Sequence, residues 1–206
     1  MVASLFSFLV AAVLLTLAPG PDIIFVATKS LARGAKAGIS VAAGLCSGVF
    51  FHTALAAFGV SLIFRQSPLA FNVLKVAGTL YLLWLAVQAF RHRNDGIGKG
   101  EGEEPRSRFS ELYRTGVLMN VLNPKVALFF LALLPQFVPA DASRPWLNML
   151  LLGGIFSAQA FLIFSLVSLC AGTLFSALNT RPSVTKYLNV LTSIVLFAIA
   201  ASLFFL

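Results

Sequence analysis

The sequence predicts an all-α integral membrane protein with six transmembrane helices, arranged as two inverted repeats of three helices each. Of the 206 residues, 59% are hydrophobic and 11% are charged, whereas a soluble domain carries about 25% charged residues. Six apolar runs are each long enough to cross a bilayer, which takes about 20 residues. The first and fourth runs are both interrupted by a proline motif, at Pro19-Gly20-Pro21 and at Asn123-Pro124.

The six predicted spans divide into two halves. Residues 1–90 hold three spans, and residues 115–206 hold the other three. Between the halves, residues 91–114 have the composition of a hydrophilic linker. Because three is an odd number, the two halves must enter the membrane with opposite orientations. The spans are placed at residues 3–28, 37–64, 69–90, 115–138, 146–176 and 187–206.

Basic residues predict the orientation of the chain. Of the 15 Lys and Arg residues, 11 lie in the connections that follow the first, third and fifth spans. The opposite side holds Arg65 and Arg144, with Lys75 near the interface. Because cytoplasmic loops carry an excess of Lys and Arg, we expect the long loop in the cytoplasm and both termini on the periplasmic or extracellular side. The net charge of +8 is therefore interpreted as a topology signal rather than as a nucleic-acid-binding surface.

The sequence offers no pattern that calls for a disulfide, a metal or another cofactor. Cys46 and Cys170 are the two cysteines, and both lie in apolar runs, so we expect buried structural thiols rather than a pair of soft-metal ligands. The first apolar run has no basic segment before it, which argues against a cleaved signal peptide.

Each proline motif carries an ionisable residue within an apolar span. Asp22 follows Pro21, and Lys125 follows Pro124. Proline has no backbone N–H and interrupts a helix, and in lipid the freed backbone groups need protein partners or a wet cavity. A charge in such a position is a functional-site hypothesis by default. Paired interruptions in corresponding spans of two inverted halves point to the binding site of a transporter.

The two charged residues have both structural and functional interpretations. They can form a permanent ion pair that fixes the first and fourth spans, or Asp22 can cap an interfacial helix after a short helix that ends at Pro19. In the functional interpretation, substrate or protonation of Asp22 opens the pair. An amino acid would then place its ammonium on Asp22 and its carboxylate on Lys125 and on N–H groups of the restarted helices. Asn123 is well placed as an N-cap with Pro124 at the first helical position.

Other polar and small residues have less specific interpretations. Gly44 and Gly48 form a GxxxG motif that allows close packing of helices, and Gly153-Gly154 is expected to do the same. His52, Ser157 and Gln159 either line a cavity or satisfy one another across helices.

Three motifs, taken in order, resemble the LysE/RhtB family of lysine and homoserine/threonine exporters. They are the Ala18-Pro-Gly-Pro-Asp break, residues 78–85, and the stretch from Phe109 through Asn120 to Phe130. The family more often has Thr where this chain has Ala18. The resemblance covers nearly the whole chain and implies a bacterial inner-membrane amino-acid exporter driven by the proton gradient. It matches the signature positions of that family at Pro19, Gly20, Pro21, Asp22, Asn123, Pro124 and Lys125.

The combined interpretation is a secondary transporter that exports amino acids, with Asp22 coupling to protons. A neutral substrate, such as homoserine, threonine or a branched-chain type, is favoured because a dibasic one would gain from a second deep acid. The alternatives are export of another small solute or a metal ion, as in the wider superfamily, and a channel or structural membrane subunit. A membrane-embedded enzyme is disfavoured because no catalytic cluster lies in the spans. Amino acid, protons and lipid are the expected partners, and small-residue faces are compatible with a homo-oligomer.

Overall fold

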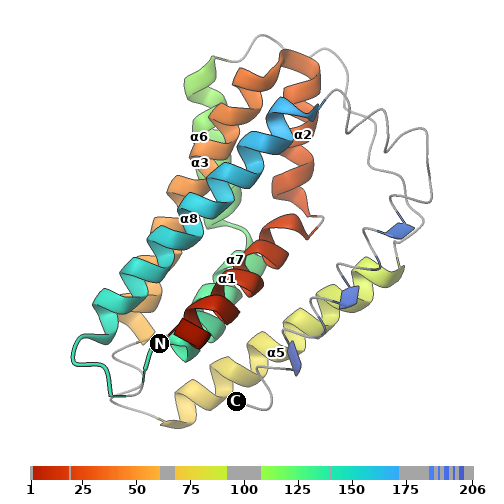
Figure 1. Ribbon diagram of the computed structural model, residues 1–206. Helices are drawn as coiled ribbons and strands as arrows, with labels where there is room; N and C mark the ends of the chain where they lie inside the picture. Colours follow the sequence, from red (N-terminus) through yellow and green to blue (C-terminus); the bar gives the residue numbers. More distant parts are fainter. Residues whose placement is uncertain are drawn as a thin grey trace.

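The structure, a computed structural model, describes residues 2–18, 20–60, 68–91, 108–139 and 141–171, together with scattered residues between 186 and 201. These described residues form helices and no strand (Figure 1). In order, the helices are α1 (Val2–Leu17), α2 (Pro21–Arg33), α3 (Ala35–Ala54) with its π-helical continuation η1 (Leu55–Val60), α5 (Pro68–Arg91), α6 (Phe109–Val121), α7 (Pro124–Leu128), the π-helical η2 (Phe129–Leu133), the 3₁₀ turn η3 (Leu134–Phe137) and α8 (Pro145–Leu169).

Two of the helical segments are bent at the proline motifs. The axes of Leu5–Leu17 and Pro21–Arg33 meet at 54°, and those of Phe109–Val121 and Pro124–Phe137 meet at 50°. Each second segment begins with a proline at its first position, where the missing N–H costs nothing because the first N–H groups of a helix have no partner within it. The chain therefore restarts as a helix directly after each break.

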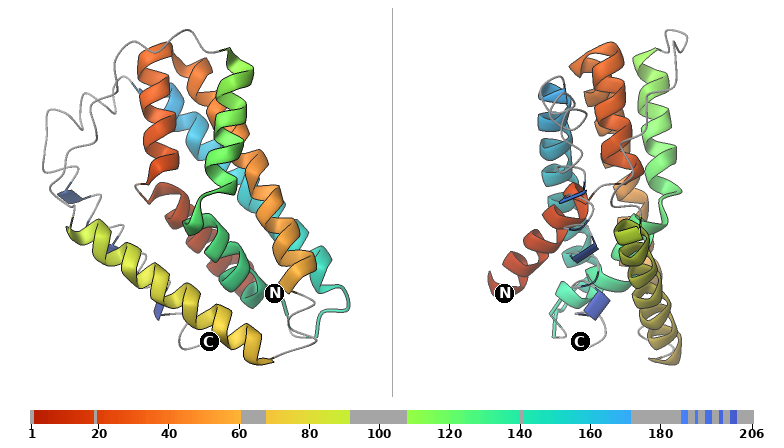
Figure 2. Two further views of the ribbon diagram at one scale, coloured as in Figure 1. Left: turned by 180° about the vertical axis from the view of Figure 1, so that it is seen from behind. Right: turned by 90° about the vertical axis from the view of Figure 1, so that its right-hand side faces the viewer.

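Four helices form the central bundle, in which α3 contacts α2, α6 and α8 (Figures 1 and 2). Glycines allow the closest approach, because a Cβ at Gly44 would overlap the backbone carbonyl of Tyr113, and one at Gly116 would overlap that of Val41. A Cβ at Gly48 would lie 2.7 Å from that of Asn120. The packing role predicted for the GxxxG motif is confirmed. Gly153 likewise packs against Thr53, but no atom of the described residues lies within 4 Å of a Cβ added at Gly154, so the prediction was wrong for that residue.

The remaining helices cover the other side of the breaks. Helix α1 packs against α8, and α5 runs on the far side of α1 and α7 from α8, where it contacts η2 (Figures 1 and 2). At the opposite end of the bundle, Gly34 joins α2 to α3 with a φ of 84°, a left-handed conformation that favours glycine. The bundle and α1 thus enclose the two breaks.

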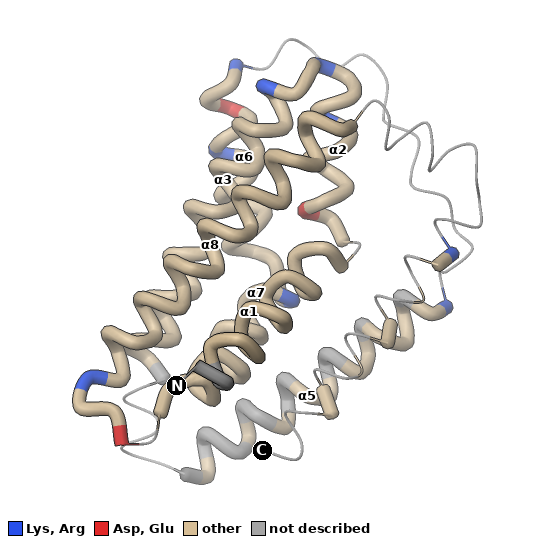
Figure 3. The backbone as a smooth tube through the Cα atoms, in the orientation of Figure 1, with Lys and Arg blue, Asp and Glu red and all other residues tan. Residues whose placement is uncertain are grey.

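Within the described residues, two helices are long and apolar enough to cross a membrane. They are Ala35–Gly59 and Pro145–Leu169, and the count rises to four if each bent pair is one span. The mean hydropathy of the whole chain, +0.93, agrees with a membrane protein. Lys and Arg gather at the end of the bundle where α2 ends and α3 and α6 begin (Figure 3).

Helix bounds differ in places from the predicted spans. Helix α2 continues past residue 28 to Arg33. Helix α6 begins at Phe109, within the segment predicted as a loop, because the Glu111 side chain accepts a hydrogen bond from the Arg108 N–H at 2.8 Å and so caps the helix. Pro19, Arg65, most of the long loop, the ends of the second and fifth predicted spans, and most of the sixth lie outside the described residues.

Candidate functional site

The two helix breaks meet through one hydrogen bond. Asn123 donates from Nδ2 to Oδ2 of Asp22 at 2.9 Å, which joins residues 101 positions apart in the sequence. Both side chains are buried, with exposed fractions of 5% for Asn123 and 6% for Asp22. Because Asp22 lies in the first turn of α2, the positive end of the helix dipole also stabilises its carboxylate.

Asn123 is fixed in orientation by a second contact. Its Oδ1 accepts a hydrogen bond from the Lys125 backbone N–H at 3.0 Å, as expected for the N-cap of α7. The N-cap role predicted for Asn123 is therefore confirmed. One consequence is that the Lys125 N–H is already used, so it is not free for a substrate carboxylate.

The Lys125 ammonium lies at the C-terminal end of α1 rather than on Asp22. Its Nζ donates to the carbonyl oxygens of Leu15 at 3.3 Å and of Ala18 at 3.4 Å. The last carbonyls of a helix lack partners within it, and they form the negative end of its dipole. The negative end of the α1 dipole therefore stabilises the Lys125 ammonium. This offsets the repulsion that a cation experiences near the positive end of the α7 dipole. A Cβ on Gly20 would lie 3.1 Å from Nζ, so the glycine leaves room for this side chain.

The predicted ion pair is therefore not the arrangement found. In the described part of the chain, Asn123 holds Asp22, while the carbonyls of Leu15 in α1 and of Ala18 just after it hold Lys125. The two charges nonetheless line one cavity of about 20 Å³. A cavity of this size holds about one water molecule and is too small for an amino acid. The other oxygen of Asp22, Oδ1, is buried and has no hydrogen-bond partner among the residues that the structure describes.

Polar groups on α3 and α8 form hydrogen bonds between helices, and two of these bonds reach the segments just before the breaks. On α3, His52 donates from Nε2 to the backbone carbonyl of Asn120 at 3.0 Å, four residues before Pro124. On α8, Gln159 donates from Nε2 to the Thr16 hydroxyl at 2.9 Å, and Ser157 donates to the Cys46 carbonyl at 3.0 Å. His52, Ser157 and Gln159 thus make bonds between helices, and none of the three lines the cavity.

The structure brings together the predicted site residues that it describes. Asp22, Asn123 and Lys125 are linked as above, and Gly20, Pro21 and Pro124 form the breaks that place them. Sequence reasoning missed Thr16 and Asn120, which also line the cavity. Each is a polar residue in an apolar run close before a proline motif, a signal that could have identified them.

The thiols follow the prediction only in part. Cys46 is buried and lines the cavity, whereas Cys170 is exposed. Among the described residues no group of three or more His, Cys, Asp and Glu side chains could hold a metal ion.

Broken helices that bring a carboxylate and an ammonium to one cavity inside an apolar bundle are characteristic of membrane transport proteins. The chain belongs to the LysE family of translocators, because the model of the "LysE type translocator" family matches residues 13–205. It is accordingly a transporter and not an enzyme.

The names of similar proteins agree with this assignment. The chain is 30% identical over 200 residues to the leucine efflux protein of Klebsiella pneumoniae subsp. pneumoniae, covering 96% of this chain and 92% of that protein. It is 35% identical over 133 residues to the homoserine/homoserine lactone efflux protein of Salmonella typhimurium, covering 65% and 64%. The leucine efflux protein of Salmonella choleraesuis is 26% identical over 202 residues, covering 98% and 95%. No solved structure matches the chain.

Proposed function

We propose that this protein exports neutral amino acids across the bacterial inner membrane, driven by the proton gradient. One observation carries the proposal: a buried carboxylate and a half-buried ammonium, held at two helix breaks, line the same cavity. This pair of charges is complementary to the ammonium and carboxylate of an amino acid. The relatives named as leucine and homoserine efflux proteins support the same substrate class.

Asp22 is the proposed binding group for the substrate ammonium and for the coupled proton. Its Oδ2 is held by Asn123, while no described residue donates a hydrogen bond to Oδ1. A buried carboxylate oxygen without a donor is costly, and an ammonium would supply one. Protonation of Asp22 removes its negative charge, so a proton that arrives from outside displaces the ammonium. One carboxylate thereby exchanges an outgoing amino acid for an incoming proton.

Lys125 is the proposed partner of the substrate carboxylate. Its ammonium is held by two backbone carbonyls at 3.3 and 3.4 Å, which are neutral acceptors at long distances. A carboxylate is a stronger acceptor for an ammonium than a carbonyl. Substrate would therefore draw Nζ away from the end of α1, which links binding to a change at the first break.

Transport requires that the cavity open alternately to the two sides of the membrane. At about 20 Å³ it is closed to an amino acid here, so we propose that the two halves rock about their proline breaks. In the proposed orientation both termini are periplasmic and the basic end of the bundle faces the cytoplasm (Figure 3). Two functions compete with this proposal. The protein could export another solute or a metal ion, or it could be a channel. Assembly into a homo-oligomer is compatible with each of these functions.

The decisive experiment is release of labelled amino acids from substrate-loaded vesicles under two imposed pH gradients. We expect release from the parent to follow the gradient. Asp22→Asn should lower it about tenfold or more, because a hydrogen bond to a charged group contributes about 1.5–3 kcal/mol. The control is Asp141→Asn, which makes the same change at an exposed position between η3 and α8 and should release like the parent.

The competing functions predict other results. Release that neither the gradient nor Asp22→Asn changes would identify a channel and return Asp22 to a structural role. Absence of amino-acid release, with release of a metal ion or another solute from vesicles loaded with it, would overturn the substrate class.

A further inference from the structure

We infer that an apolar subsite between α3 and α8 binds the side chain of the exported amino acid and selects branched aliphatic side chains. We call it the side-chain subsite, and it consists of Leu45, Cys46, Val49, Phe156, Ala160 and Phe164. The inference rests on the proposed function, in which Asp22 and Lys125 bind the two charged groups of the substrate. It adds where the side chain of the substrate binds and how large that side chain can be.

Once the two charged groups of the substrate are bound, the cavity lining has no further charged group to pair with a charged substrate side chain. Asp22 and Lys125 are the ionised groups in its lining, and the zwitterion uses both. Thr16 already accepts from Gln159 and donates to the carbonyl of Ala12 at 2.8 Å, so its hydroxyl is satisfied. A charged side chain would have no counter-ion there, and burying it unpaired would be costly. An uncharged, apolar side chain meets no such penalty.

Helix α8 supplies one wall of the side-chain subsite. Phe156, Ala160 and Phe164 recur every four residues, so they lie on one face of the helix. All three are buried, and Ala160 has an exposed fraction of 1%. All three line the cavity that Asp22 and Lys125 also line. Because Ala160 places a methyl group between two phenyl rings, we expect a notch in the wall at this position.

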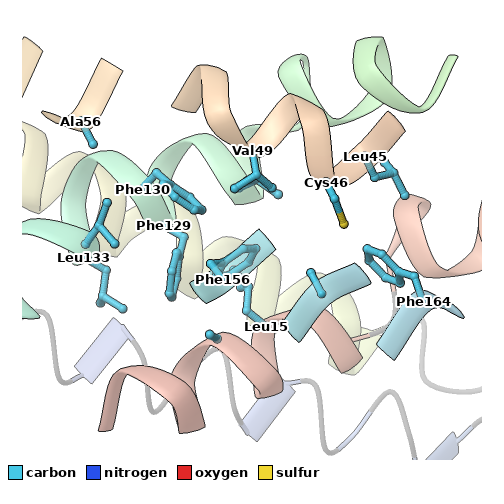
Figure 4. Close-up of a cluster of buried hydrophobic side chains, with 14 of the residues drawn as sticks. Leu15, Leu45, Cys46, Val49, Ala56, Phe129, Phe130, Leu133, Phe156 and Phe164 are labelled. Carbon is cyan, nitrogen blue, oxygen red and sulfur yellow. The ribbon is translucent and has the colours of Figure 1, made fainter. Parts of the chain in front are cut away.

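Helix α3 supplies the opposite wall. Leu45, Cys46 and Val49 extend from α3 toward Phe156 and Phe164 (Figure 4). Leu45 and Val49 are one helical turn apart, and both are buried. Since the two walls are made of carbon and one thiol, the favourable term for binding here is burial of apolar surface, about 25 cal/mol per Å².

The wall at Phe156 is fixed by other aromatic rings, which limits how far it can adapt. The centroid of its ring lies 5.5 Å from that of Phe129 and 5.0 Å from that of Phe130 (Figure 4). Because these three rings pack tightly, Phe156 has little freedom to move. The space available to a substrate side chain therefore depends on the size of residue 160, which lies between Phe156 and Phe164. A branched aliphatic group matches a notch one residue wide, whereas an aromatic side chain requires these rings to move.

The first test fills the notch. Ala160→Leu should lower the ratio of leucine to alanine export about tenfold or more, because one or two methylenes in a hydrophobic pocket discriminate by about that factor. Ala158→Leu is the matched control, since it makes the same change on the exposed face of α8 and should leave the ratio unchanged. An equal loss for leucine and alanine in Ala160→Leu would overturn the size limit.

The second test needs no transport and uses Cys46, which lies in the side-chain subsite. In a Cys170→Ser background, modification of Cys46 by N-ethylmaleimide is followed in detergent with leucine or glycine present. Leucine should slow modification, because its side chain covers the thiol, whereas glycine should not, although it carries the same two charges. The same comparison in Asp22→Asn should show no protection by leucine.

The outcomes separate this inference from the function on which it rests. If amino acids are exported but leucine and glycine protect Cys46 equally, the subsite is wrong and the proposed function stands. If no amino acid is exported and none protects Cys46, both are wrong. If Ala160→Leu does not fold, protection of Cys46 in the parent sequence still decides the matter.

Discussion

Asn123 is the residue on which the two halves of the site depend. Its Nδ2 donates to Asp22, and its Oδ1 accepts from the Lys125 N–H. The donor and the acceptor of one amide therefore perform different tasks, and no other side chain of this size provides both. Asparagine at this position makes the carboxylate and the second break a single unit.

The first prediction exchanges the carboxylate and the amide. Asn123→Asp keeps the acceptor that caps α7 but places a second carboxylate against Asp22. We expect a loss of stability of about 1–3 kcal/mol or more from the lost donor and the added repulsion. Combining it with Asp22→Asn restores one carboxylate and one amide, so the double variant should recover most of that loss.

Thermal unfolding of the purified protein in detergent measures this exchange. Asp22→Asn alone is the control for loss of the carboxylate. If the double variant is as unstable as the sum of the two single variants, the two side chains are not coupled in the folded protein.

At the scale of elements, the glycine contacts between α3 and α6 set how closely the halves approach. A Cβ at Gly44 would overlap the backbone carbonyl of Tyr113, and a backbone group cannot rotate away as a side chain can. Two side-chain contacts reinforce this interface, from Ser40 to the Phe109 carbonyl at 2.7 Å and from Tyr113 to Ser47 at 2.9 Å.

The second prediction tests the close approach at Gly44. Gly44→Ala should destabilise the protein by about 1–3 kcal/mol, the usual cost of overpacking a tight interface. Gly154→Ala is its control, because none of the described residues lies within 4 Å of the added methyl group, and alanine should be neutral or slightly stabilising there. Equal melting temperatures for the two variants would show that α3 and α6 have room to separate.

Local chemistry explains which features of the fold and the site could be predicted from the sequence. The bends, the N-cap at Asn123 and the charges beside them depend on proline and on a capping side chain, and their effects reach only a few residues. The spacing of Gly44 and Gly48 predicted that another helix packs closely against this face of α3. It could not predict that this helix is α6, because the sequence of one helix face does not determine which helix packs on it. For the same reason the contact of Lys125 with Leu15 and Ala18, over more than a hundred residues, was beyond sequence reasoning.

At the scale of the whole molecule, the distribution of charge relates the bundle to the membrane. Basic residues collect where α2 ends and α3 and α6 begin (Figure 3), while the connection between η3 and α8 lies at the other end of the bundle (Figure 1). The excess of positive charge favours the cytoplasm for the first of these ends.

The third prediction places each end on one side of the membrane. In a background of Cys46→Ser and Cys170→Ser, Ser143→Cys should react with a membrane-impermeant thiol reagent in intact cells. Ser110→Cys, at the start of α6, should react only after the cells are permeabilised. Both serines are exposed, so the comparison depends on sidedness rather than burial, and the reverse pattern would invert the proposed topology.

The close contact of α3 with α6 also has a consequence for synthesis of the protein. Ser47 and Tyr113 are 66 residues apart, and at about 5–20 residues per second the ribosome needs roughly 3–13 s to make that stretch. During this interval the newly inserted α3 presents its glycine-lined face without its eventual neighbour. Biogenesis therefore passes through a half-built stage that can be met by an insertase, by membrane proteases or by the same stage of another nascent chain.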